Sequence, residues 1–207
     1  ALFFVQLLWF FGLHGQIIVN SVMDPIWNTL MLENLEAYKA DHALPHIVTK
    51  PFMETFTVGL GGSGMTLAVV LLMAFVMKKK QYRDVGRLAL APAVFNVNEP
   101  VIFGFPIVLN ATIFIPWLIA PLIVTALNYT VMAIGLVPAP TGVSVPWTVP
   151  IFFSGMLATN SVLGGILQLI DVVLVGLIWF PFIKMLDRQK DPLANYRLFY
   201  PVVSSKL

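Results

Sequence analysis

The stretch at 88–109, LALAPAVFNVNEPVIFGFPIVL, places the strongest constraint on the fold of this chain. It is apolar over a length that suits a membrane, yet it carries a carboxylate, Glu99, at its middle, where a charge is costly. Its three prolines disfavour one straight helix, because each lacks an N–H and restricts the preceding residue. We expect two half-helices that meet at a broken tip, NVNEP, and present Asn96, Asn98 and Glu99. The alternative is a proline-kinked spanning helix with a protonated, structural Glu99.

The composition indicates an integral membrane protein. Hydrophobic residues make up 58% of the 207 residues, charged residues only 11%, and the mean hydropathy is +0.88, outside the range of ordinary soluble domains. The chain has no cysteine, which excludes a disulfide framework, a thiolate metal site and a cysteine nucleophile. The three histidines lack metal-ligand spacing, and a net charge of +2 does not indicate nucleic-acid binding. We therefore expect no metal, no cofactor and no nucleic-acid partner.

The first apolar segment, 1–23, has about the 20 residues that cross a bilayer and is followed by an Asp-Pro pair. Steps of three or four residues place Gln6, Trp9 and His14 along one broad side of the expected helix. A single histidine in an apolar helix often only packs against its neighbours. A packing role and a substrate-facing role therefore both stay open for His14.

Two further segments complete the first half of the chain. Residues 24–55 are polar and mix both charge signs, so we expect an external loop, in which NTLMLENLEAYKAD forms a short amphipathic helix. Residues 56–77 form the next predicted span, with a glycine cluster, GLGGSG at 59–64, near its start. Such a cluster permits either close approach by another helix or free backbone groups that bind a polar ligand.

The basic residues set the expected topology. Ten of the twelve lysines and arginines flank the segment from 88 to 183, so the positive-inside rule places both flanks in the cytoplasm. An even number of full crossings must then lie between them. Spans at 111–136 and 161–185, with re-entrant hairpins at 88–109 and 137–160, satisfy this condition. Two additional full crossings in place of the hairpins would also satisfy it.

The second expected hairpin, 137–160, contains four prolines and has Trp147 between two of them at its tip. An interfacial anchor is the alternative role for Trp147. In the last span, 161–185, Gln168 and Asp171 lie one turn apart on a face that should look into the protein. We prefer a buried structural role for Asp171 over a role in shaping a site.

The predicted fold is thus an all-α integral membrane protein with about four full transmembrane helices plus two re-entrant helical hairpins. The side before residue 1, the segment 78–87 and the tail at 186–207 are expected in the cytoplasm.

Four motifs follow one another in the chain: FGLHG at 11–15, GLGGSG at 59–64, NVNEP at 96–100 with VIFGFPIVLN, and VPWTVP at 145–150. Together they resemble the lactose/cellobiose/diacetylchitobiose branch of the membrane-embedded IIC components of the bacterial phosphotransferase system (PTS). The match runs through nearly the whole chain. Compared with a complete family member, an N-terminal half is lacking, and in that family this half carries further spans and the main contacts of a homodimer.

The resemblance implies a multi-pass permease of the bacterial cell membrane that translocates a β-linked disaccharide of the cellobiose, diacetylchitobiose or lactose type. Inside the cell, a phosphocysteine on a partner IIB protein, itself supplied by IIA, would phosphorylate a sugar hydroxyl. Because the phosphoryl carrier lies on the partner, the resemblance does not decide whether this chain is itself an enzyme. By the family pattern, hydrogen bonds to the sugar and packing on its rings come from a set of residues that includes His14, Glu99, Trp9, Ile102, Trp147, Gln6 and Asn98.

The residue chemistry agrees with this implication, because sugars need hydrogen-bonding groups for their hydroxyls and flat apolar faces for their C–H surfaces. Glu99 could also orient a hydroxyl and take its proton during phosphoryl transfer, and His14 is the second catalytic candidate. An ion-coupled symporter or channel that uses Glu99 and Asp171 is an alternative, and a purely structural membrane subunit is another. The tryptophans favour a sugar over an ion, and the broken hairpins disfavour a structural subunit.

Overall fold

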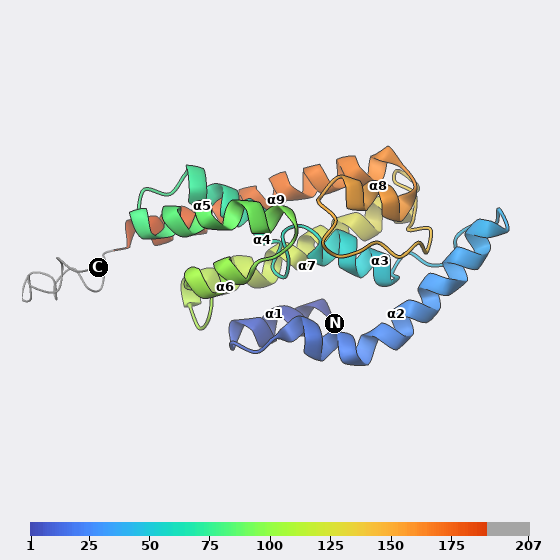
Figure 1. Cartoon of the computed structure of the whole chain (residues 1–207), viewed down its shortest axis with the longest axis horizontal. Coiled ribbons are helices and arrows are strands. Elements are labelled where there is room, and N and C mark those ends of the chain that lie inside the picture. The colour runs from blue at the N-terminus through green and yellow to red at the C-terminus, as the bar shows by residue number, and fades with distance from the viewer. Residues whose placement is uncertain (190–207) are drawn as a thin grey trace, which may run out of the picture.

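The computed structural model describes residues 1–189, and within this range every regular element is a helix (Figure 1). The prediction of an all-α fold is therefore confirmed for the described residues. The predicted tail beyond residue 189 lies outside them. The elements in order are α1 (Leu2–Phe10), α2 (Gly15–Lys39), α3 (Lys50–Met53), the π-helix η1 (Glu54–Val58), α4 (Thr66–Phe75), α5 (Lys80–Val94), α6 (Glu99–Gly104), α7 (Ala111–Ala133), α8 (Phe153–Thr159) and α9 (Val162–Arg188).

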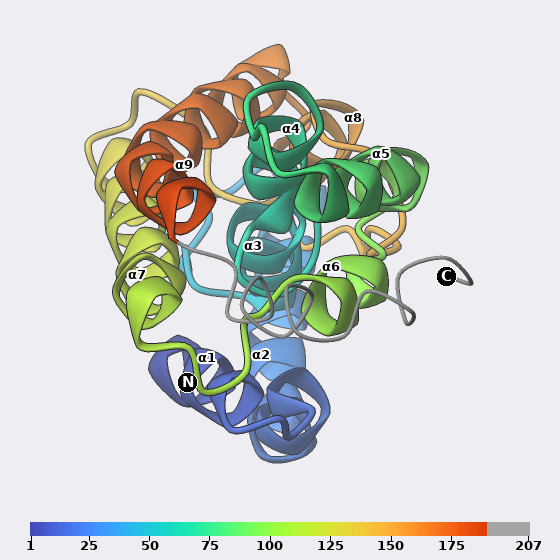
Figure 2. The same cartoon turned by 90° about the vertical axis from the view of Figure 1, so that its left-hand side faces the viewer.

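The longer helices pack side by side around α4. Figure 2 shows α7 next to α9, α4 between α9 and α5, and the α1–α2 pair against one side of this group. Residues 67–70 of α4 and Met73 are all buried. A Cβ at Gly86 of α5 would lie 2.6 Å from the Cβ of Met73, so only a glycine allows the two helices to approach this closely. The buried rings of Trp117 and Trp179 fill the core from α7 and α9.

Two helices in the described part of the chain, α7 and α9, are long and apolar enough to cross a membrane. They coincide with the predicted spans at 111–136 and 161–185. Their outward faces are apolar as well, since Ile119, Ile123, Ile170 and Val173 are exposed. A surface of this kind suits a lipid environment and is uncommon on soluble proteins.

The prediction of one continuous helix at 1–23 is wrong. Helix α1 ends at Phe10, Gly12 adopts a φ of +80°, and α2 begins at Gly15 and runs through Pro25 to Lys39. The two helices fold back on each other so closely that a Cβ at Gly15 would lie 2.1 Å from the carbonyl oxygen of Val5. Glycines thus allow the reversal, whereas the proline, which we expected to end a helix, sits inside one. Much of the expected loop at 24–55 is therefore helical.

The segment at 56–77 is not one helix either. The π-helix η1 ends at Val58, and the glycine cluster at 59–64 forms a turn in which three glycines have positive φ angles. Helix α4, which follows, spans only ten residues. Four of these six residues are glycines, which have no Cβ and therefore adopt positive φ angles without a steric penalty. The segment thus turns where we expected a continuous helix.

The stretch at 88–109 is broken at the predicted place. Helices α5 and α6 are separated by the non-helical residues 95–98, although α5 begins earlier than expected and passes through Pro92. The stretch at 137–160 differs from the predicted pair of half-helices, because it consists of an irregular arm with turns that leads into the single short helix α8. Four prolines in the arm explain why it does not form a helix. The re-entrant course of both segments through a membrane remains a prediction.

Candidate functional site

A cavity of about 380 Å³ lies where the broken segments converge. The first turns of α2 form one wall, together with Trp9 of α1. The π-helix η1 and the glycine turn form a second wall, and the tip at 95–98 and Trp147 form a third. Each wall is a place where a helix begins or is interrupted, so polar backbone and side-chain groups are concentrated around the cavity.

Asn96 joins three of these segments. Its side-chain Nδ2 donates to the carbonyl oxygens of Trp147 at 2.7 Å and Val149 at 3.1 Å, and its Oδ1 accepts from the N–H of Gly61 at 2.8 Å. Asn96 itself has a φ of +63°, a conformation that asparagine adopts more readily than most residues. The NVNEP and VPWTVP segments are therefore in contact, and the side chain of Asn96 makes this contact.

Asn98 fastens the same tip to the glycine turn, because its Nδ2 donates to the carbonyl oxygen of Ser63 at 2.7 Å. Gly62 lies directly under this contact with a φ of +85°, and a Cβ there would be 2.6 Å from Cγ of Asn98. The glycine turn thus lets the NVNEP tip approach its backbone. It also brings Gly62 and Ser63 to the cavity wall.

The α1–α2 wall carries two predicted residues. The rings of Trp9 and His14 lie 4.3 Å apart between centroids, at an interplanar angle of 47°. Nδ1 of His14 accepts from the N–H of Ile17 at 3.4 Å, so Nε2 is the donor nitrogen of the neutral ring, and it has no hydrogen-bond partner among residues 1–189. Trp9 is buried, and its indole N–H has no hydrogen-bond partner among the described residues.

The carboxylate of Glu99 opens to the cavity from the first residue of α6. Trp147 faces the same space and is 56% exposed, so most of its ring is free for a ligand. With Trp9, His14 and Asn98, five of the seven predicted site residues line one cavity.

Two predicted residues do not line it. Gln6 is fully buried beside α7, where its carbonyl oxygen accepts from the indole N–H of Trp117 at 2.8 Å. Ile102 is 3% exposed and packs in the hydrophobic core. The break after Phe10 explains the first case, because the periodicity that placed Gln6 with His14 assumes a helix that continues between them.

The sequence prediction missed several polar lining residues. Gln16 and Asn20 lie one turn apart in α2 and are joined by a hydrogen bond of 3.1 Å, while Gln16 also accepts from the hydroxyl of Ser63 at 3.3 Å. The spacing of four residues between the two amides would have revealed them as one polar face. Glu54 lines the cavity from η1, and we had assigned it to an external loop.

Glu54 belongs to a charged cluster with Lys50 and Asp24. Lys50 Nζ lies 2.7 Å from Oδ2 of Asp24 and 3.4 Å from Oε1 of Glu54. Burial raises the pKa of Glu54 above its usual value, and the neighbouring Lys50 only partly opposes this. The lysine thus pairs more closely with Asp24 than with the glutamate at the cavity.

A second layer holds η1 in place. Nε2 of Gln168 donates to the carbonyl oxygen of Thr55 at 2.9 Å, and Nδ2 of Asn128 donates to that of Phe56 at 3.0 Å. Asn128 is oriented by Asp171, whose Oδ2 accepts from the same nitrogen at 2.9 Å. Asp171 is fully buried and does not line the cavity, so it contributes to the structure that supports the wall.

Known proteins share this sequence and fold. The family described as "Phosphotransferase system, EIIC" matches residues 1–121. Over 188 residues the chain is 61% identical to the "PTS system oligo-beta-mannoside-specific EIIC component" of Bacillus subtilis (strain 168). This alignment covers 91% of the present chain and 42% of the relative. Over 193 residues it is 45% identical to the "PTS system cellobiose-specific EIIC component" of Geobacillus stearothermophilus, with 92% and 43% covered.

A solved structure is similar over the same region. The crystal structure of the transporter ChbC, the IIC component from the N,N'-diacetylchitobiose-specific phosphotransferase system, matches with a TM-score of 0.88 and 41% sequence identity. The match covers 95% of this chain and 45% of ChbC, so the chain spans less than half the length of these relatives. Since the family covers more than half of the chain and the relatives cover nearly all of it, the chain belongs to the phosphotransferase system EIIC family.

Proposed function

We propose that this chain is the sugar-binding part of a PTS permease that translocates a β-linked disaccharide and presents it to a phosphorylated IIB partner. The observation that carries the proposal is the convergence of Trp9, His14, Asn98, Glu99 and Trp147 on one cavity. Its volume of about 380 Å³ falls within the range of about 300–1,000 Å³ that is typical of small-molecule sites.

The two tryptophans supply the apolar faces that pack on the C–H surfaces of sugar rings. The free Nε2 of His14 donates to a sugar hydroxyl, and the carboxylate of Glu99 accepts from one. The relatives are named for an oligo-beta-mannoside and for cellobiose, and this favours a β-linked substrate for the present chain.

Glu99 also serves the phosphoryl transfer. When a sugar hydroxyl attacks the phosphocysteine of IIB, an O–P bond forms, the S–P bond breaks, and the hydroxyl proton needs an acceptor. A carboxylate beside the hydroxyl orients it and takes this proton. His14 holds the sugar in register for the step.

Uptake of labelled disaccharide by vesicles that contain the full-length protein tests the proposal, with phosphorylated IIB present or absent inside. We expect internal sugar to be phosphorylated only when IIB is present. Glu99→Gln should keep much of the sugar binding but lose coupled uptake, whereas Glu33→Gln, at an exposed position of α2, is the matched control. Near-normal coupled uptake by Glu99→Gln would leave Glu99 as a binding group only.

The same proposal includes a multi-pass location in the bacterial cell membrane, with 78–87 in the cytoplasm and the cavity reached through re-entrant segments. An N-terminal half would provide the homodimer contacts. Cysteines introduced as Lys80→Cys and Lys39→Cys should then be labelled from the cytoplasmic and the outer side, respectively. Labelling of both from one side would refute this topology.

A further inference from the structure

We propose that the cavity rejects anionic sugars, including the phosphorylated product, through the combined negative charge of Glu54 and Glu99. Neutral disaccharides and cationic amino sugars are accepted. This inference rests on the proposed function, because it concerns what the same cavity does before and after phosphoryl transfer.

The first observation is the charge of the lining. Glu54 and Glu99 both face the cavity, and no lysine or arginine does so among residues 1–189. Apart from His14, the remaining polar side chains of the lining are amides and one hydroxyl. A sugar phosphate that enters this space thus meets two carboxylates and finds no lysine or arginine within the lining. The phosphoryl group of IIB differs from it, because that group arrives held by its own protein.

The second observation concerns Lys50, the cation nearest to Glu54 in the described structure. Its Nζ lies 2.7 Å from Asp24 and 3.4 Å from Glu54, so one positive charge is shared between two carboxylates. The cluster keeps a net negative charge. Lys50 could reach a phosphate only by leaving Asp24, whose other oxygen, Oδ1, is buried and already lacks a partner in the described part of the chain.

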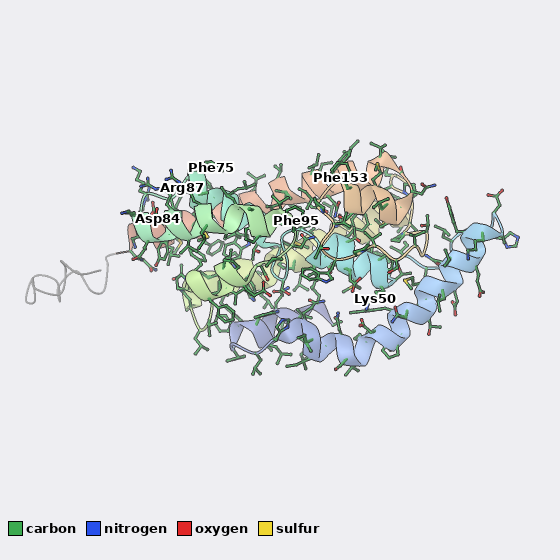
Figure 3. All side chains as sticks on the ribbon, viewed as in Figure 1. Lys50, Phe75, Asp84, Arg87, Phe95 and Phe153 are labelled. Carbon is green, nitrogen blue, oxygen red and sulfur yellow. The ribbon has the colours of Figure 1, made fainter. Side chains whose placement is uncertain are left out.

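The third observation is where the other positive charges lie. Lys78 and Lys79 precede α5, and their backbone N–H groups donate to the carboxylate of Asp187 at 2.9–3.1 Å, next to the end of α9. Figure 3 shows Arg87 at this end of the molecule, far from Lys50, which lies against α2. Positive charge is thus concentrated at the end predicted to be cytoplasmic, outside the cavity, where it attracts an anion that leaves.

The physical consequence is a one-way site. Like charges in a partly desolvated cavity repel more strongly than in bulk water, because the surrounding dielectric constant is lower and salt screens them less. A neutral disaccharide does not experience this repulsion. Once a phosphoryl group has been transferred, the product carries a charge of about −2 and is driven out of the cavity, and it does not rebind from the cytoplasm.

Binding titrations with purified full-length protein test the inference, using the tryptophan fluorescence or the heat of binding as the readout. The probes are cellobiose, its 6'-phosphate, its uncharged 6'-O-acetyl derivative and the doubly cationic glucosamine disaccharide. We expect the phosphate to bind at least tenfold more weakly than the acetyl derivative, which is the control for added bulk. The cationic disaccharide should bind no more weakly than cellobiose.

Variants then assign the effect to the carboxylates. Glu54→Gln keeps the shape of the side chain and should reduce the ratio of acetyl-derivative to phosphate affinity at least threefold, and Glu99→Gln should reduce it as well. Glu33→Gln removes the same charge from an exposed position that pairs with His46, and should leave the ratio unchanged. High salt should narrow the difference in the unmodified protein, because electrostatic repulsion is screened.

The outcomes separate this inference from the proposed function. If none of the probes binds, the proposed sugar site is wrong. If cellobiose binds but the phosphate binds as tightly as the acetyl derivative, the sugar site stands and the rejection of anions is wrong. A tenfold difference that persists in both glutamine variants and at high salt would also overturn the inference, since it would then arise from shape.

Discussion

Asn96→Ala tests whether the site is held together by one side chain. The amide of Asn96 is 4% exposed and makes three hydrogen bonds, to the N–H of Gly61 and to the carbonyl oxygens of Trp147 and Val149. Alanine removes all three and leaves the buried N–H of Gly61 and the two carbonyl oxygens, which are partly buried, without these partners. It must also adopt the φ of +63° that Asn96 has, which a Cβ without a polar group disfavours.

The expected loss can be estimated from these parts. A net contribution of about 0.5–1.5 kcal/mol for each hydrogen bond gives about 1.5–4.5 kcal/mol for three. The left-handed backbone adds about 1 kcal/mol for alanine. We therefore expect Asn96→Ala to lower the free energy of unfolding by about 2.5–5.5 kcal/mol, most of it from the hydrogen bonds.

Unfolding of the detergent-solubilised protein measures this loss, and a disaccharide titration measures its effect on the site. Asn96→Gly removes the same hydrogen bonds but tolerates the positive φ, so it should be more stable than Asn96→Ala by about 1 kcal/mol. Sugar affinity should fall in both variants, because the tip at 95–98 is no longer tied to Trp147. If Asn96→Ala lowers the free energy of unfolding by less than about 1 kcal/mol and keeps normal sugar affinity, Asn96 does not hold the segments of the site together.

Three further predictions follow from the geometry. Trp9→Ala and Trp147→Ala should each weaken disaccharide binding by about 1–3 kcal/mol, and unchanged affinity in both titrations would make the rings structural or membrane anchors. Because burial raises the pKa of Glu54, the folded state binds the proton more tightly than the unfolded state does, so the free energy of unfolding should rise as the pH falls through that raised pKa toward the usual value of a glutamate. This rise in the free energy of unfolding should be smaller in Glu54→Gln. Identical pH profiles for Glu54→Gln and the unmodified protein would contradict the prediction. Gln168→Leu should cost about 2–4 kcal/mol in the same unfolding assay and weaken sugar binding, although Gln168 does not line the cavity. If the free energy of unfolding of Gln168→Leu is unchanged, Gln168 does not stabilise η1.

The break at NVNEP could be predicted because its cause is local. Pro100 restricts Glu99 directly before it, and Asn96 is a residue that accepts a left-handed backbone. The membrane-like helices α7 and α9 could be predicted for a similar reason, since length and apolar content are properties of one segment. The motif order carried the family resemblance, and with it five residues that line the cavity.

The wrong predictions share a different cause. At 1–23 an apolar segment of membrane-spanning length concealed the reversal at Gly12, which depends on how closely α2 packs against Val5. Gln6 was placed by the periodicity of a helix that ends at Phe10. Pro25 has the strongest local signal for a helix end in this region, yet α2 passes through it and continues to Lys39.

The sequence by itself determined that the chain is helical, apolar enough for a membrane, and interrupted at its proline and glycine clusters, because composition and backbone restriction act within a few residues. Only the tertiary structure decided which interruptions meet. Asn96 reaches Trp147 across 51 positions of the chain, and Glu54 joins the cavity from a π-helix held by Asn128 and Gln168. Contacts of this separation depend on the packing of every helix between them, and no pattern within a single segment records that packing.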